Sequence, residues 1–138
     1  MEVEINGVAV LAAAAINMIV GAIWYSPYVF GKQWMKLTGV TPQSMKESGN
    51  KGMLAALVRS LLTAFVLAHL IFLSHSFFQN SYLQDSLMTG FWVYFGFIGS
   101  TLLMHDTFEG RRKKLSLINA SNEFVTIMVM AVVVGLFG

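Results

Sequence analysis

The sequence predicts an all-α fold, an integral membrane four-helix bundle with both termini outside the cytoplasm. Hydrophobic residues make up 56% of the 138-residue chain and charged residues only 12%, against about 45–50% and about 25% in soluble domains. A soluble protein of this size could not bury so much apolar surface. The two other observations are four long apolar segments and the position of every basic residue in or beside two of the loops between them.

Each of the four apolar segments is close to the length that a membrane requires. They lie at about residues 5–25, 53–73, 87–104 and 115–137. A helix crosses the hydrocarbon core with roughly 20 mostly apolar residues, and the first segment would extend for about 30 Å. The chain is short enough for one domain. We therefore predict a single transmembrane domain over residues 1–138.

The charged residues orient these spans. Four lysines lie between the first two spans, Arg59 lies just inside the second, and residues 111–114 are all basic and precede the fourth. The opposite side carries Glu2, Glu4 and Asp85, with no lysine or arginine. Lysine and arginine accumulate in cytoplasmic loops, so the two basic loops are predicted to be cytoplasmic.

The cytoplasmic loops are then residues 26–52 and 105–114, and the N- and C-termini are extracytoplasmic. We expect a multi-pass protein of the inner (plasma) membrane. Its basic loops would attract anionic lipid headgroups, with about 1 kcal/mol for each basic residue. The expected partners are the lipid bilayer and a second copy or another membrane protein. A basic cluster in a short loop between two spans does not suit nucleic acid.

The first loop contains signals for two short helices. Pro27 ends or bends the first span. Residues 29–37 have aromatic side chains at helical spacing with lysines on another face, which predicts an amphipathic helix in the headgroup region. Thr41 and Pro42 are typical of a helix start, and residues 48–52, rich in glycine and polar side chains, are expected to end that helix soon after it begins. The second loop, residues 76–86, is brief and polar.

Five polar residues inside the spans form a candidate intramembrane polar seam: Asn17, Arg59, Asn119, Asn122 and Glu123. Arg59 and Glu123 lie at nearly the same depth, on the cytoplasmic side of the middle of their spans, so an ion pair would neutralise both charges. The pair could serve as a structural salt bridge, or Glu123 could be a proton or cation site, or both side chains could reach water. Asn17 could join helices by hydrogen bonding or bind a solute or ion.

Other polar residues have simpler explanations. His105 and Glu109 are four residues apart and could face one ligand, but a metal site usually needs three or more such groups. We therefore predict no metal, cofactor or catalytic residue. The chain has no cysteine, which excludes disulfides and thiolate chemistry. Gly96 and Ser100 form a small-residue face that could pack against another helix.

Two stretches carry a resemblance to a known family. Residues 21–27, with the sequence Gly-Ala-Ile-Trp-Tyr-Ser-Pro, continue into Phe-Gly-Lys at 30–32 and Trp-Met at 34–35, and a second stretch runs from Phe108 to Arg111 and on to residues 117–119. Together they resemble the small bacterial and fungal membrane proteins grouped as domain of unknown function 1761. The resemblance implies a four-helix membrane protein and no known activity.

The same resemblance places any shared site at the cytoplasmic boundary. This candidate cytoplasmic-interface motif comprises Trp24, Tyr25, Ser26, Lys32, Trp34, His105, Glu109 and Arg111, with Asn119 nearby. Three functions remain open. The first is a non-enzymatic helical-bundle protein that associates with itself or a membrane partner. The second is a small transporter or channel subunit with a polar path through Glu123, Arg59 and Asn17. The third is a membrane enzyme acting on lipid at the cytoplasmic interface.

A dry seam around Glu123 would favour the first function, and a water-reachable cavity beside it the second.

Overall fold

The computed structural model describes residues 4–137; residues 1–3, including Glu2, and residue 138 lie outside the described part. The described chain is helical and contains no strand, which confirms the predicted all-α class. The elements are α1 (Gly7–Trp24), α2 (Gly31–Thr38), α3 (Pro42–Phe78), α4 (Tyr82–Val93), the π-helix η1 (Tyr94–Gly99), α5 (Ser100–Phe108) and α6 (Lys113–Phe137). Four helical segments are long and apolar enough to cross a membrane: α1, α3, α4 through α5, and α6.

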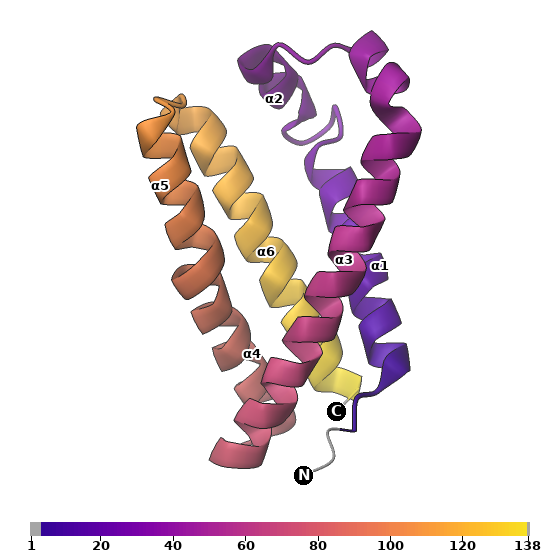
Figure 1. Cartoon of the computed structure of the whole chain (residues 1–138), viewed down its shortest axis with the longest axis vertical. Helices are drawn as coiled ribbons and strands as arrows, with labels where there is room; N and C mark the ends of the chain where they lie inside the picture. Colours follow the sequence, from indigo (N-terminus) through magenta and orange to yellow (C-terminus); the bar gives the residue numbers. More distant parts are fainter. Residues whose placement is uncertain (1–3, 138) are drawn as a thin grey trace.

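These four segments run up and down in alternation (Figure 1). One end of the molecule holds α2, the start of α3 and the connection between α5 and α6. We call it the basic end, because the lysines and the Arg111–Lys114 cluster lie there. The opposite end holds the start of α1, the turn between α3 and α4, and the end of α6.

The predicted break in the first loop is wrong. Residues 48–52 do not interrupt the helix, because α3 runs without a break for 37 residues. Its start was correctly placed: the Thr41 side chain accepts a hydrogen bond from the backbone N–H of Ser44, the Ser44 side chain accepts one from the backbone N–H of Thr41, and Pro42 follows. The glycines at 49 and 52 cost about 1 kcal/mol each relative to alanine. Once nucleated, a helix propagates through such residues because each one satisfies a further backbone hydrogen bond.

The predicted second loop is also shorter than expected. Only residues 79–81 separate α3 from α4, so most of the segment 76–86 belongs to the two helices. Gln79 adopts a left-handed conformation with φ of 56° and ends α3, and the Ser81 side chain caps the backbone N–H of Gln84 to start α4. The predicted amphipathic helix at 29–37 is present as α2.

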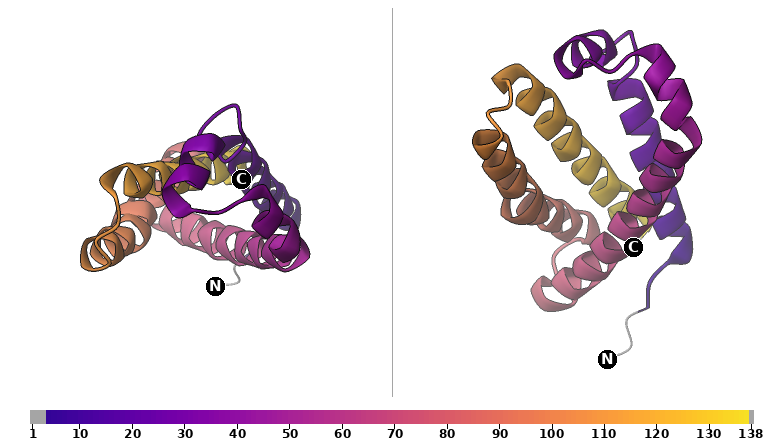
Figure 2. Two further views of the ribbon diagram at one scale, coloured as in Figure 1. Left: turned by 90° about the horizontal axis from the view of Figure 1, so that it is seen from above. Right: turned by 45° about the horizontal axis from the view of Figure 1, so that its top comes forward.

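The hydrophobic core lies in the half of the bundle away from the basic end. It includes Ala13 and Ala14 of α1, Ala64, Leu67 and Ile71 of α3, and Met130, Ala131 and Val134 of α6. By contrast, every residue from 41 to 59 is exposed. Figures 1 and 2 show the cause: at the basic end the first half of α3 and the pair α5–α6 diverge from each other. The bundle is closed at one end and open at the other.

Small residues allow α4 and α6 to approach closely. A Cβ added at Gly90 would lie 2.9 Å from the Cβ of Ala131, and one added at Gly135 would lie 2.9 Å from Ser86 Oγ. Ser86 and Gly90 on α4 therefore face Ala131 and Gly135 on α6, each pair spaced by four residues, as in close membrane helix contacts. The predicted small-residue face at residues 96 and 100 is exposed, and a Cβ added at Gly96 would meet nothing within 4 Å.

Candidate functional site

An ion pair joins α3 and α6 within their apolar parts. Arg59 donates a hydrogen bond from Nη2 to Oε2 of Glu123. The Arg59 side chain is 51% exposed and the Glu123 side chain 17% exposed. The glutamate is therefore enclosed by protein, while its partner also faces an open space. The matched depths of the two residues along their helices had predicted this contact.

The open space is a shallow hollow of about 550 Å³ on the surface of α3, lined by residues of that helix alone. Seven residues line it: Lys51, Leu54, Ala55, Val58, Arg59, Leu62 and Thr63. We call it the Arg59 groove. It begins at the basic end and reaches past the ion pair, and Leu62 and Thr63 also line a second hollow of about 280 Å³ bounded by α3, α4, η1 and α6. The two hollows therefore adjoin at Leu62 and Thr63.

Aromatic side chains fasten the end of α1 to α6 one turn before the ion pair. Trp24 Nε1 donates to the backbone carbonyl of Ile118 at 3.1 Å, and Tyr25 Oη donates to Oδ1 of Asn119 at 2.9 Å. Trp34 of α2 stacks edge-on against Tyr25, with ring centroids 5.4 Å apart. These contacts hold α1, α2 and α6 together at the basic end, so α6 presents Glu123 from a fixed position.

The chain between α1 and α2 folds into a tight turn that only glycine allows. The backbone N–H groups of Val29 and Gly31 donate to the carbonyl of Ser26 at 3.2 and 2.9 Å. A Cβ at Gly31 would lie 2.2 Å from the Tyr25 carbonyl oxygen, a distance no side chain could tolerate. The neighbouring Lys32 is exposed. Ser26 and the glycine before Lys32 therefore have a structural role in this turn.

The other polar residues of the predicted seam are buried but less connected. On α6, Asn122 and Thr126 are four residues apart and are 7% and 2% exposed. Asn122 Oδ1 and Thr126 Oγ1 have no hydrogen-bond partner within residues 4–137. Asn17 is also buried, on α1, and within that same range no hydrogen bond joins it to Arg59 or Glu123. The role of Asn17 in a polar path stays a prediction.

The remaining residues of the predicted interface motif form a separate cluster at the end of α5. Arg111 contacts Asp106 at 3.2 Å and Glu109 at 2.6 Å, and His105 Nδ1 lies 3.9 Å from Glu109. Figures 1 and 2 place the end of α5 on the other side of α6 from α2. The motif therefore divides into two groups rather than forming one site. In the described part of the chain, no three histidine, aspartate or glutamate side chains could hold a metal ion together.

A family model described as a protein of unknown function (DUF1761) matches residues 8–135. The chain belongs to this family. The match confirms the resemblance carried by the two motifs, and it covers all four long apolar helical segments. No curated protein and no solved structure matches the chain. DUF1761 membership names no reaction or ligand, so a function has to be argued from the geometry of this chain.

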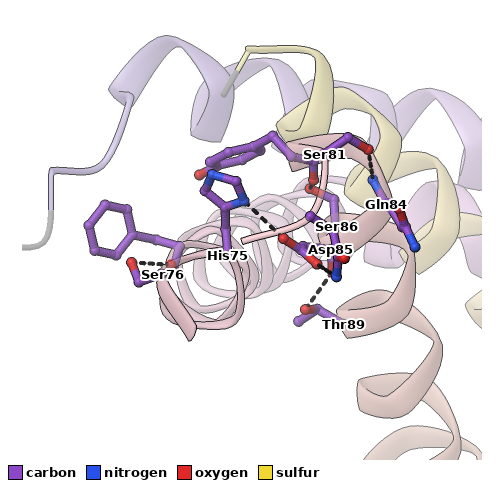
Figure 3. A network of polar contacts seen from close by, with 10 residues as sticks. His75, Ser76, Ser81, Gln84, Asp85, Ser86 and Thr89 are labelled. Carbon is purple, nitrogen blue, oxygen red and sulfur yellow. Dashed lines mark hydrogen bonds and ion pairs between the residues drawn. The ribbon is translucent and has the colours of Figure 1, made fainter. Parts of the chain in front are cut away.

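A further polar cluster of this DUF1761 protein was not predicted as a unit (Figure 3). Asp85 is 0% exposed and accepts a hydrogen bond from Asn80 Nδ2 at 2.8 Å. His75 Nδ1 lies 2.9 Å from its other carboxylate oxygen, and the His75 ring packs on Tyr82. The sequence placed Asp85 in the brief polar loop on the side opposite the basic loops. The structure instead buries Asp85 where α3 turns into α4, and the cluster joins these two helices.

Proposed function

We propose that this DUF1761 protein is a subunit of a small transporter and that the Arg59 groove is the cytoplasmic part of its transport path. The observation that carries the proposal is the exposure of the ion pair. Arg59 is half exposed beside a groove, although it lies within an apolar span. A protein whose helices simply pack together would enclose such a pair in a dry seam.

The depth of Arg59 argues that water or a polar solute reaches it. Arg59 follows Lys51 by eight residues, which places it about 12 Å along the helix from the basic boundary. The hydrocarbon core is about 30 Å thick, so Arg59 would lie inside it, on the cytoplasmic side of its middle. A guanidinium exposed to lipid there is costly. Because the hydrogen bond to Glu123 directs the side chain towards α6, it does not extend along α3 to the headgroups.

The shape of the bundle supports a path that is open on one side. The core of alanine, leucine, isoleucine and methionine side chains closes the half away from the basic end. In the other half, the first half of α3 diverges from α5 and α6. With the basic loops in the cytoplasm, as expected from their charge, this arrangement corresponds to an inward-open conformation.

In one copy, α3 alone lines the groove. Four spans are few for a complete path, so we propose that a second copy covers the groove. Self-association also belongs to the competing function, a bundle protein without transport. The two differ in whether the space beside Arg59 is wet.

Accessibility of single cysteines tests the proposal, and the natural absence of cysteine makes the chain suitable. Thr63→Cys places a thiol in the groove. Phe65→Cys is the matched control, since Phe65 lies two residues away, is 53% exposed and lines no groove. In sealed inside-out vesicles, a membrane-impermeant thiol reagent is expected to label the cysteine at position 63 at least tenfold faster than the one at position 65. Equally slow labelling at both positions would indicate a dry seam and favour the packing protein.

A further inference from the structure

We infer that a second groove, between α5 and α6, binds one acyl chain of an anionic phospholipid from the cytoplasmic leaflet. This α5–α6 groove has a volume of about 820 Å³ and is lined by residues of η1, α5, the α5–α6 connection and the first half of α6. It involves neither Arg59 nor Glu123, so the inference does not depend on transport.

The groove exists because α5 packs much less closely on α6 than α4 does. Small residues line its floor, including Gly99, Ser116 and Ala120, while Leu103 and Leu117 stand exposed at its rims. Its lining is therefore predominantly apolar. In a bilayer, a slot of this composition accepts hydrocarbon, since a polar solute would lose its hydration there.

Aromatic packing closes the deep end of the groove. Tyr94 Oη donates to the carbonyl of Ala120 at 2.8 Å, and the Tyr94 ring packs edge-on against Phe95 and Phe124 at centroid distances of 5.1 and 5.0 Å. From Tyr94 to Asp106 the chain rises by about 18 Å. One leaflet contributes about 15 Å of hydrocarbon. The groove therefore matches the depth of a single leaflet.

The charge at the open end selects an anionic headgroup. Arg111 is already neutralised, since Asp106 and Glu109 both contact it. Three further cations, Arg112, Lys113 and Lys114, are exposed and take part in no salt bridge within the described range, and Lys113 lines the groove. The first turn of α6 carries no acidic residue, so its positive dipole end is also available to a phosphate. Charge complementarity thus favours a phospholipid with net negative charge.

Lipid binding to the purified full chain in mild detergent tests the inference. Native mass spectrometry would count phosphatidylglycerol and phosphatidylcholine molecules retained per chain at equal concentrations. Ala120→Phe fills the groove, and Ala56→Phe adds the same bulk at an exposed position outside it. We expect one retained phosphatidylglycerol per chain, a loss of at least tenfold in affinity with Ala120→Phe, and no change with Ala56→Phe.

A second pair of variants changes charge without altering packing. Lys113→Gln removes the lysine that lines the groove, and Lys46→Gln removes an exposed lysine of α3. Lys113→Gln is expected to weaken phosphatidylglycerol binding about fivefold and to leave phosphatidylcholine unchanged, whereas Lys46→Gln should leave both unchanged.

Three results would overturn the inference. The first is equal retention of both lipids. The second is displacement of phosphatidylglycerol by inorganic phosphate together with normal binding in Ala120→Phe, which would assign the cations to a free anion. The third is a change of oligomeric mass in Ala120→Phe, which would place a second protein copy in the groove.

Discussion

The close contact between α4 and α6 makes Gly135 the position where one methyl group should have the clearest effect. An alanine Cβ there would lie 2.9 Å from Ser86 Oγ, 3.0 Å from Leu83 Cδ1 and 3.1 Å from Leu83 Cα. The first two atoms could rotate away, but the third belongs to the backbone. Gly135→Ala must therefore push α4 and α6 apart by a few tenths of an ångström.

The expected magnitude follows from two opposing terms. Overpacking a close contact costs about 1–3 kcal/mol, while replacing glycine by alanine in a helix gains about 1 kcal/mol. Gly135→Ala should therefore reduce the free energy of unfolding by about 0–2 kcal/mol. Gly21→Ala is the matched control, because a Cβ at Gly21 meets nothing within 4 Å, and it should gain up to about 1 kcal/mol.

Thermal unfolding in detergent, followed by circular dichroism, measures the difference between the two variants. The expected loss in Gly135→Ala and gain in Gly21→Ala together separate the two variants by about 1–3 kcal/mol in the free energy of unfolding. For a chain of this length, this difference corresponds to roughly 4–12 °C in apparent Tm. Ser86→Ala removes the nearest of the three atoms, so Gly135→Ala should cost less in that background than in the native chain. If Gly135→Ala and Gly21→Ala shifted the melting temperature by the same amount in the same direction, α4 and α6 would not be in close contact.

Three further predictions concern the polar groups. Arg59→Leu leaves the enclosed Glu123 without its counter-charge and should destabilise the protein by about 1–3 kcal/mol, which is below the range for fully buried pairs because the arginine is half exposed. Denaturant titration should show that the double variant Arg59→Leu, Glu123→Leu loses less stability than Arg59→Leu alone. An equal or larger loss in the double variant would argue against the pair. Asp85→Asn removes the charge that strengthens two buried hydrogen bonds and should cost about 1.5–3 kcal/mol, so an unchanged Tm would contradict the cluster. Lys46→Cys and Gln79→Cys, both exposed, should react with an impermeant thiol reagent from opposite faces of a sealed vesicle, and labelling from one face would refute the predicted orientation.

The four helical segments could be predicted from the sequence, because the length of an apolar run is a local property of the chain. The sequence was not sufficient to predict that the helix starting at Pro42 continues into the second span, since the glycines at 49 and 52 signal a break that helix propagation overrides. The π-helix of residues 94–99 depends on a single extra residue in the hydrogen-bond register, and no residue type marks it. The extra residue rotates α5 relative to α4. The small-residue spacing at 86 and 90 and that at 96 and 100 look equivalent in sequence, but only the first is at the contact.

The candidate site was predictable to a similar degree. Arg59 and Glu123 could be paired from sequence because the rise of a helix converts residue counts into depth. The contacts of Trp24 and Tyr25 with α6 depend on the rotation of two helices, which apolar spacing leaves open. Asp85 was missed because acidic residues near a short loop are usually solvated. The short polar turn could have revealed the cluster. With only three residues between α3 and α4, residues 75 and 85 lie side by side.

The distribution of these contacts restricts the motions available to the proposed transporter. At the end away from the basic loops, α3 is joined to α4 by the buried Asp85 cluster, and α4 is joined to α6 by the contact at Gly135. At the basic end, α1 and α2 are fastened to α6 through Trp24 and Tyr25, whereas α3 up to Arg59 has no buried residue. In a transport cycle, the first half of α3 is therefore the element that can move against α6. The contact that this motion would break is the ion pair of Arg59 with Glu123, so a solute that competes for either charge would couple its own binding to the opening of the groove.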